Sequence, residues 1–459
     1  MTPASPAVTA PAAGTRASVG SVAIVADDLT GAADSAVQFA RAGWAARLAL
    51  GGDVQQHGHD GSVIAIVTDA RAQDPDEARA STRAAVARAV ADGDDRLFVK
   101  IDSTMRGTVQ EQVEGALAAW SSREPSAVAV VCPAYPAMGR TVEGGLLLVD
   151  GRGVETTSVG RDPVTPVTTS ALAVLLPGSA HVEAASDAAD LAVRIATAAA
   201  AGARVVTVDA VTTADLRFVA EALALLGPRA VPVGSAGLAG EMAREWGVGL
   251  EAPRADAPRA AASVAAPRHV VVVVSSLHDV SRGQHAHLAA AAAEGSLAER
   301  VRTIAPALDA LIGDGDADAT ADEDGIDADA VSVTVVLAPE RTARVDRSTP
   351  DASPTVAERV AAGLARIADR VITRRGASAL VLMGGEGARA VLTRQGADAI
   401  LVRDAIREGM PLGTIEGGRL HGMPVVTKAG GFGSPSSLTD IVPELLDHPA
   451  STPTQGEAP

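Results

Sequence analysis

The stretch SVAIVADDLTGAADSAVQFARAG, residues 21–43, decides the fold class. It starts with a short apolar run, continues through the polar turn DDLTG and ends in an Ala-rich amphipathic segment closed by Gly43. Strand, turn and helix in this order are typical of the βαβ units that build parallel sheets. Thr30 is a candidate cap of the helix. We expect Asp27 and Asp28 at the carboxyl edge of the sheet, where open α/β folds bind ligands.

The same alternation repeats along the chain in two blocks. In the first block, a helix is expected from Pro75 to about Asp92, because Asp74 supplies a cap and the proline suits the first helical position. The candidate strands are 63–68, 97–100, 128–132 and 204–209 in the first block, and 269–276, 331–338, 378–383 and 424–428 in the second. We predict an α/β fold of two domains, each a mostly parallel sheet flanked by helices, with the active site in the cleft between them.

The domain boundaries follow from shifts in composition. A Pro- and Ala-rich stretch lacks strand or helix periodicity and is interpreted as a linker, and an acidic, low-complexity stretch is interpreted as a loop insert. The predicted parts are a disordered tail at 1–20, a first domain at 21–250, the linker at 251–268, a second domain at 269–446 with the acidic insert at 313–330, and a disordered tail at 447–459.

Composition excludes several classes of protein. The 459 residues carry a formal net charge of -17, and no dense Lys/Arg cluster interrupts that acidity, so nucleic acid is not an expected partner. Cys132 is the single cysteine, which suits a reducing compartment. The N-terminus lacks a signal-peptide pattern, and no apolar run approaches the roughly 20 residues that span a bilayer. We expect a cytoplasmic protein without a membrane partner; the sequence leaves its oligomeric state open, a homo-oligomer included.

The first block carries a loop suited to a polyhydroxy carboxylate. KIDSTMRGT, residues 100–108, follows a predicted strand and combines cations, an acid and hydroxyls. A ligand carboxylate would be held by Arg106 or Lys100. The side chains expected to meet ligand hydroxyls are Asp102, Ser103 and Thr104. A solvated loop with a glycine turn is the alternative interpretation.

Two further arginines follow predicted strands of this block. Arg71 comes after the strand at 63–68, and Arg140 ends the Pro-rich loop VVCPAYPAMGR. A lone arginine in such a position is more often the partner of a surface ion pair than a ligand clamp. We expect a ligand site here because these loops converge on one edge of the sheet.

The second block has two Gly-rich turns that follow strands. LMGGEGARAVL, residues 382–392, and TKAGGFGS, residues 427–434, would let backbone N–H groups approach a phosphate, with Lys428 available for its charge. The serines at 275–276 follow the first strand of this block. There is no GxxxxGK[ST] motif, which excludes an ordinary Walker A nucleotide site.

Seven motifs, in order along residues 21–446, resemble those of the four-carbon acid sugar kinase family. They are ADDLTGA, KIDSTMRGT, PAYPAMGRT, DPVTPV, VGSAGLA, GGEGARAVL and KAGGFG. The resemblance implies an N-terminal sugar-acid domain, a C-terminal nucleotide domain, and ATP-dependent phosphorylation of the terminal C4 hydroxyl of threonate, erythronate or 3-oxo-tetronate. It also implies contacts to substrate from Asp28, Arg71, Lys100, Ile101, Asp102 and Ser103, and contacts to ATP from Ser276, Gly384, Gly385, Glu386, Gly387 and Gly430.

Asp28 is the candidate general base, because it lies at the edge of the first strand. Mg²⁺ is expected to bridge the β- and γ-phosphates of ATP, although the sequence does not identify its ligands. Two alternatives remain open: a non-catalytic sugar-acid sensor, and an ATP-dependent ligase that activates a carboxylate.

Overall fold

The computed structural model describes residues 19–51, 59–162, 164–250, 268–313, 332–340 and 356–447. The predicted linker apart from Arg268, the predicted acidic insert apart from Gly313, and nearly all of the two predicted tails lie outside the described residues.

The first half of the chain forms the parallel sheet that the sequence predicts. Its strand order is β2-β3-β1-β4-β11-β5-β10-β9, and every pair in it is parallel. All residues of β1, β5 and β11 are buried, as expected for strands covered on both faces by helices. The strands are β1 (Val22–Ala26), β2 (Ala45–Ala49), β3 (Ser62–Val67), β4 (Arg96–Lys100), β5 (Val128–Cys132), β9 (Ala180–Val182), β10 (Val205–Val208) and β11 (Ala230–Gly234).

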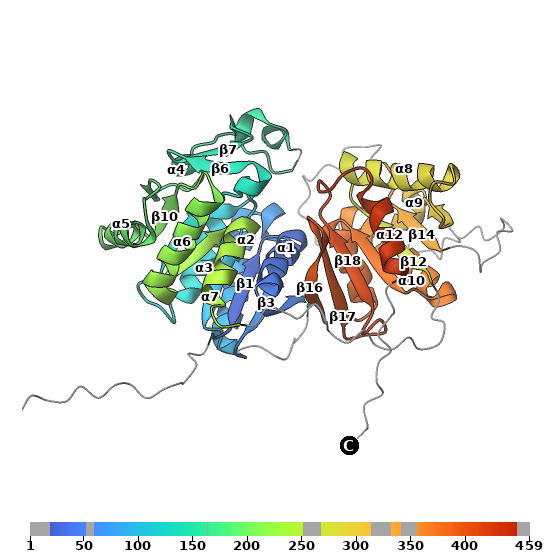
Figure 1. Cartoon of the computed structure of the whole chain (residues 1–459), viewed down its shortest axis with the longest axis horizontal. Coiled ribbons are helices and arrows are strands. Elements are labelled where there is room, and N and C mark those ends of the chain that lie inside the picture. The colour runs from blue at the N-terminus through green and yellow to red at the C-terminus, as the bar shows by residue number, and fades with distance from the viewer. Residues whose placement is uncertain are drawn as a thin grey trace, which may run out of the picture.

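Helices cover both faces of this sheet. Helices α1, α5, α6 and α7 pack side by side in one layer, and α2 packs on α3 in the other. A small antiparallel sheet of β6, β7 and β8 lies beyond the main sheet (Figure 1). The elements are α1 (Leu29–Arg41), α2 (Pro75–Asp92), α3 (Val109–Trp120), α4 (Leu172–Leu175), α5 (Ala188–Ala200), α6 (Thr213–Leu226), α7 (Ala236–Trp246), β6 (Arg140–Glu143), β7 (Leu146–Val149) and β8 (Arg152–Gly153).

The second half repeats the arrangement on a smaller scale, with the parallel order β13-β14-β12-β15-β18. Helices α9, α10 and α11 pack together, and α8 packs on α12. The elements are β12 (Val270–Val274), β13 (Val301–Ile304), β14 (Val333–Leu337), β15 (Ala379–Met383), β18 (Pro424–Lys428), α8 (Asp279–Ala293), α9 (Leu308–Ile312), α10 (Val356–Arg375), α11 (Gly385–Arg394) and α12 (Ser437–Asp447).

A hairpin of β16 (Ala399–Arg407) and β17 (Met410–Glu416) joins the two halves. Strand β16 pairs antiparallel with β2, and β17 pairs antiparallel with β18, so the strands form one 15-stranded sheet instead of two separate sheets. Three antiparallel pairings reverse the strand direction between the halves. Helix α1 packs across this junction, against β16, β17 and the start of α11 (Figure 1).

Local signals in the sequence located the strands β1, β3, β4, β5, β10, β12, β14, β15 and β18 and the helices α1, α2 and α11. The structure confirms the helix from Pro75 with its Asp74 cap, whose carboxylate accepts from the N–H groups of Asp76 and Glu77. The prediction that Thr30 caps the first helix is wrong. Asp28 is the N-cap, because its carboxylate reaches the N–H of Gly31 and the helix begins at Leu29. No helix among the described residues is both long and apolar enough to cross a membrane.

Candidate active site

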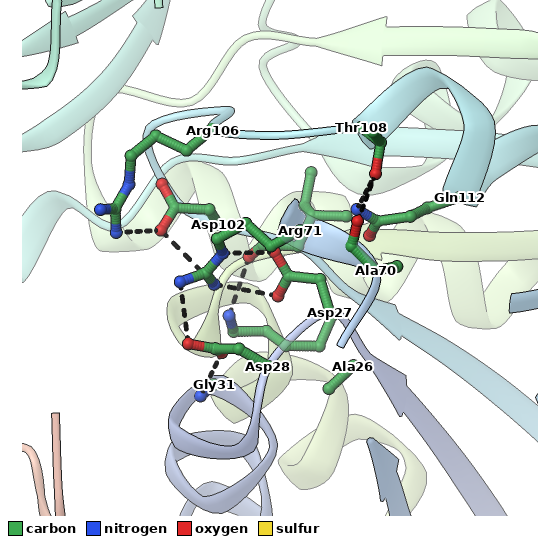
Figure 2. Close-up of polar contacts among 12 residues, drawn as sticks. Ala26, Asp27, Asp28, Gly31, Ala70, Arg71, Asp102, Arg106, Thr108 and Gln112 are labelled. Atoms are coloured by element: carbon green, nitrogen blue, oxygen red, sulfur yellow. Dashed lines mark hydrogen bonds and ion pairs between the residues drawn. The ribbon is translucent and has the colours of Figure 1, made fainter. Parts of the chain in front are cut away.

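An arginine clamped by carboxylates lies at the carboxyl end of β1 (Figure 2). Arg71 comes from a short 3-10 helix, Ala70–Ala72, that follows β3. Its Nε and Nη2 donate to the two carboxylate oxygens of Asp27, at 2.8 and 3.0 Å, and its Nη1 donates to Asp28 at 2.8 Å. Asp27 and Asp28, one of which was predicted to face a ligand hydroxyl, are therefore both held in place by Arg71.

The loop after β4 extends this cluster. Asp102 lies 3.6 Å from Arg71 and accepts a hydrogen bond from Nη2 of Arg106 at 2.7 Å. Arg106 also donates to Asp162 at 3.2 Å. Asp102 further accepts from the backbone N–H of Thr104 at 2.9 Å. Four carboxylates and two arginines thus form one continuous network, and we call these six residues the acid–arginine cluster: Asp27, Asp28, Asp102, Asp162, Arg71 and Arg106.

Burial and charge act in opposite directions on the acids of this cluster. Burial is the largest effect on Asp27 and raises its pKa, although Arg71 opposes the shift. Burial also acts to raise the pKa of Asp28, but Arg71, Lys100 and the hydrogen bonds from Thr30 and Gly31 outweigh it, so the pKa is lowered. These contacts favour an orienting role for Asp28 over the general-base role predicted from the sequence, which stays a prediction.

Close backbone packing holds the cluster in position. Gly107 has φ +83°, and a Cβ there would lie 2.3 Å from the carbonyl oxygen of Arg71. Thr108 donates its hydroxyl to the carbonyl oxygen of Ala70 at 2.6 Å (Figure 2). The loop after β4 is therefore locked against the short helix that carries Arg71, and this position requires glycine.

The other residues predicted to bind substrate lie at different depths. The ammonium group of Lys100 is buried beside Gly31 and donates to the carbonyl oxygen of Ile101 at 2.8 Å. The side chain of Ile101 is buried, so only its backbone could meet a ligand, whereas Ser103 is half-buried. Arg140 lies on β6 and donates to the carbonyl oxygen of Met138; none of its hydrogen bonds among the described residues joins the acid–arginine cluster.

In the second half, the turns after β12 and β15 meet closely. Gly384 is the N-cap of α11 with φ +111°, and a Cβ on it would lie 2.5 Å from the hydroxyl oxygen of Ser275. A Cβ on Gly387 would lie 2.3 Å from the same oxygen. Packing therefore requires glycine at 384 and 387, two of the positions predicted to bind nucleotide. The N–H of Gly384 donates to the carbonyl oxygen of Lys428 at 3.0 Å. Glu386 is exposed in the first turn of this helix.

The turn after β18 completes this group. A Cβ on Gly430 would lie 2.4 Å from the hydroxyl oxygen of Ser276. Lys428 is buried, and its ammonium group donates to the carbonyl oxygens of Ala429 and Gly430, at 2.8 and 3.3 Å. Lys428 therefore points into its own turn, where it holds the Gly430 carbonyl together with the hydroxyl of Ser281, which donates to the same oxygen at 2.8 Å. We call the segments 275–276, 384–387 and 428–433 the glycine loops.

The acid–arginine cluster and the glycine loops approach each other where the start of α1 meets the start of α11. A Cβ on Gly385 would lie 3.6 Å from the Cβ of Leu29, the residue after Asp28. An ion pair also crosses between the halves, since Arg389 on α11 lies 2.9 Å from Asp69, two residues before Arg71. The acid–arginine cluster and the glycine loops therefore lie next to each other.

Sequence reasoning assigned no function to several of these residues. Asp162 lies in the motif DPVTPV, which was recognised as a family motif and could have directed attention to it. Nothing local marks the ion pair of Asp69 and Arg389, because its partners are far apart in the chain. The described residues hold no group of three or more His, Cys, Asp or Glu side chains arranged to bind a metal.

Comparisons with known proteins agree with this division of the site. Residues 22–242 match a family described as the sugar-binding N-terminal domain, and residues 271–438 match the nucleotide-binding C-terminal domain. The chain is 42% identical over 427 residues to a D-threonate kinase of Bordetella bronchiseptica, covering 91% of this chain and 95% of that kinase. It is 30% identical to a D-erythronate kinase of Heliobacterium modesticaldum, covering 93% and 97%.

The fold also matches a solved structure. A Haemophilus influenzae protein shares 19% identity and a TM-score of 0.66, covering 92% of this chain and 100% of that one. The chain belongs to the four-carbon acid sugar kinase family, as its motifs indicated. The predicted enzyme class, a phosphotransferase with an alcohol group as acceptor, is confirmed.

Proposed function

We propose that the protein transfers the γ-phosphoryl group of ATP to the terminal C4 hydroxyl of a four-carbon sugar acid, with threonate as the first candidate, in the cytoplasm. The contact between the starts of α1 and α11 carries this proposal, because it places the acid–arginine cluster beside the glycine loops. The choice of threonate rests on the 42% identity to a D-threonate kinase, against 30% to a D-erythronate kinase.

The acid–arginine cluster is suited to a substrate with several hydroxyl groups. Asp28 and Asp102 are ionised, because neighbouring arginines lower the pKa of each against the opposing effect of burial. Ionised carboxylates accept hydrogen bonds from hydroxyls, and the half-buried Ser103 can either donate or accept. A negative substrate carboxylate needs cations, which Lys100 and Arg106 supply at the same sheet edge. Arg140 is proposed as a further contact from β6.

The glycine loops are suited to a triphosphate. The first N–H groups of a helix lack intrahelical partners and attract anions, and α11 begins directly after Gly384. Ser276 and Gly430 meet in the adjoining turn. Mg²⁺ fits as an ion carried on the phosphates, since it commonly keeps several waters and needs only one or two protein carboxylates. When bound, it would neutralise charge that develops on the transferred group.

Incubation of the purified protein with Mg-ATP and a panel of four-carbon acids tests this proposal. The panel holds D- and L-threonate, D- and L-erythronate and 3-oxo-tetronates. We expect stoichiometric ADP and a phosphate ester at C4, located by phosphorus–proton coupling in NMR. Release of AMP or formation of an acyl phosphate would instead indicate a carboxylate-activating ligase. Binding without turnover across the panel would indicate a sensor, and either result would end the kinase proposal.

A further inference from the structure

A cavity lies where α1 faces the second half of the molecule. Its walls come from α1, from Tyr135 after β5, from the turn of the β16–β17 hairpin and from the last glycine loop. The polar and aromatic residues that line it are Asp34, Gln38, Arg41, Tyr135, Glu408 and Phe432. A group that entered this cavity would therefore touch both halves of the enzyme.

Asp34 connects the cavity to the substrate side of the site. Asp28, the N-cap of α1, is followed at intervals of three residues by Gly31 and Asp34, and residues at this spacing are neighbours on a helix surface. The ammonium group of Lys100 lies beside Gly31, at 2.6 Å from the position of a Cβ there, and its charge acts on both Asp28 and Asp34. Asp34 is thus the next carboxylate along α1 from the acid–arginine cluster.

The carboxylates around the cavity differ in their hydrogen bonds. Tyr135 donates to Glu408 at 3.1 Å, and Arg41 donates to Asp404 at 2.7 Å and lies 3.9 Å from Glu408. Asp34 accepts no hydrogen bond from any side chain or backbone N–H within the described ranges. Its oxygens are therefore available to a proton donor that enters the cavity.

Electrostatics distinguishes Asp34 from Asp28. Burial raises the pKa of Asp34 to about 7; Lys100 opposes this shift, and the negative charges of Asp28 and Glu408 add to it. Arg41 and Tyr135 also face the cavity. The pKa of Asp28 is lowered, because its hydrogen bonds and the nearby cations outweigh its burial. A proton acceptor is most effective when its pKa lies near the working pH.

We propose that Asp34 is the general base of the reaction, with the reacting hydroxyl of the sugar acid directed into this cavity. The inference rests on the kinase function proposed above. The hydroxyl oxygen forms a new bond to the γ-phosphorus while the bond from that phosphorus to the bridging oxygen of ADP breaks. The hydroxyl proton passes to the Asp34 carboxylate and from there to solvent. Asp28, fixed by Arg71 and Gly31, orients the substrate.

Asp34→Asn tests the role directly, with Asp404→Asn as a matched loss of a carboxylate that lies outside the cavity lining. We expect kcat of Asp34→Asn to fall by about 100-fold or more, while KM for ATP and sugar acid stays within about threefold. Asp404→Asn should keep kcat within about twofold of wild type. A kcat of Asp34→Asn within about threefold of wild type would overturn the proposal.

The pH profile of kcat provides a second test, which a merely structural residue would not pass. Wild-type kcat should fall as pH drops through about 7, where Asp34 takes up a proton, and Asp34→Asn should lack this acidic limb. Asp34→Glu should keep the fall of kcat at acidic pH, with a lower maximal kcat. If Asp34→Asn does not fold, Asp34→Glu provides the test of the proposal. An unchanged rate and limb in Asp34→Glu would count against the proposal.

Thermal stability checks the environment of Asp34 independently of turnover. Its pKa is raised from 3.8 to about 7, so the folded state holds this proton more tightly than the unfolded state, and stability falls as pH rises through that window. Asp34→Asn should therefore have a higher Tm than wild type at pH 8, with a smaller difference at pH 5. A lower Tm at pH 8 would reveal a stabilising partner and contradict the proposal.

These results separate the inference from the function on which it rests. Wild-type enzyme that phosphorylates a four-carbon acid, together with an equally active Asp34→Asn, would remove the inference alone. Wild-type enzyme that turns over no acid of the panel would remove the proposed function.

Discussion

Ion pairs between carboxylates and arginines hold the acid–arginine cluster together. The glycine loops are instead held together by close packing of glycines against serine hydroxyls and by one buried ammonium group. Arg71 alone contacts three carboxylates within 3.6 Å. Lys428, in contrast, donates to two carbonyl oxygens and to the hydroxyl of Ser281, and no carboxylate accepts from it within the part of the chain that the structure describes. Both groups follow the carboxyl ends of parallel strands in the same sheet.

The difference between the acid–arginine cluster and the glycine loops follows from the ligand that each is proposed to bind. A small polyol acid offers hydroxyls and one carboxylate, and directed side-chain donors and acceptors recognise these groups. A triphosphate carries dense negative charge, so carboxylates near it would be repelled, and backbone N–H groups and helix starts suit it better. The first kind of site depends on charges that compensate one another, and the second depends on space for the backbone.

The largest expected effect is the loss of the central cation of the cluster. Arg71→Ala should lower the free energy of unfolding by about 3–5 kcal/mol, because the carboxylate of Asp27 is buried and would lose its partner. Chemical unfolding measures this. Arg194→Ala, which removes an exposed arginine paired with Asp190, should cost far less. Equal costs for the two variants would show that the cluster is not held together by charge.

Lys428→Met tests the glycine loops and should change the free energy of unfolding less than Arg71→Ala does. Burial without a carboxylate partner lowers the pKa of Lys428 to about 8, so its charge is itself destabilising below that pH. We expect the free energy of unfolding at pH 7 to change by at most about 1 kcal/mol, since the loss of hydrogen bonds and the loss of this charge oppose each other. Affinity for ATP should fall about 10-fold, because the loop loses its positive charge and the Gly430 carbonyl keeps the hydroxyl of Ser281 as a side-chain donor but loses the ammonium group.

The pH range of the stability change distinguishes Lys428 from Asp28 and Asp102, whose lowered pKa values confine the pH dependence of their contribution to the range below 3.8. Between pH 8 and the ordinary lysine value of 10.5, the folded state releases a proton that the unfolded state keeps, so wild-type stability gains a contribution as pH rises. Lys428→Met should lack this contribution when unfolding is compared at pH 7 and pH 10. If Lys428→Met lost as much stability as Arg71→Ala, the contrast between the glycine loops and the acid–arginine cluster would be wrong.

The parts of the molecule that the sequence predicted well depend on local signals. The strand at Val128–Cys132 and the helix at Pro75–Asp92 follow from apolar runs, a cap and an N-terminal proline. The loops that carry Arg71 and Lys100 were placed at the sheet edge because the carboxyl ends of parallel strands meet there. The contacts of Arg71 with Asp27 and Asp28 bear out that convergence.

The parts that escaped prediction depend on contacts between distant segments. Nothing near Ala49 indicates that it pairs with Ala399, although this pairing merges the two sheets. The same holds for the cavity around Asp34, which needs α1 and the β16–β17 hairpin together. Lys428 was predicted to contact phosphate. Its ammonium group instead points into its own loop, where it donates to the hydroxyl of Ser281, a residue far away in the chain. Side-chain direction at a turn is set by tertiary packing, which periodicity does not reveal.

The smallest expected effect concerns the link between the two ends, the ion pair of Asp69 and Arg389. It is partly exposed, so Arg389→Ala should change the free energy of unfolding by no more than about 1 kcal/mol. Its position between the cluster and the start of α11 predicts an effect on the coupling of the two ligands. Bound sugar acid should enhance ATP binding about two- to fivefold less in Arg389→Ala than in wild type, as measured by calorimetry with a non-hydrolysable ATP analogue.

Arg394→Ala is the matched control, since this arginine of the same helix pairs with Asp369 inside the second half. If both variants leave the coupling unchanged, the two ends communicate through the packing of α1 on α11 alone, and the ion pair only positions the turn at Asp69.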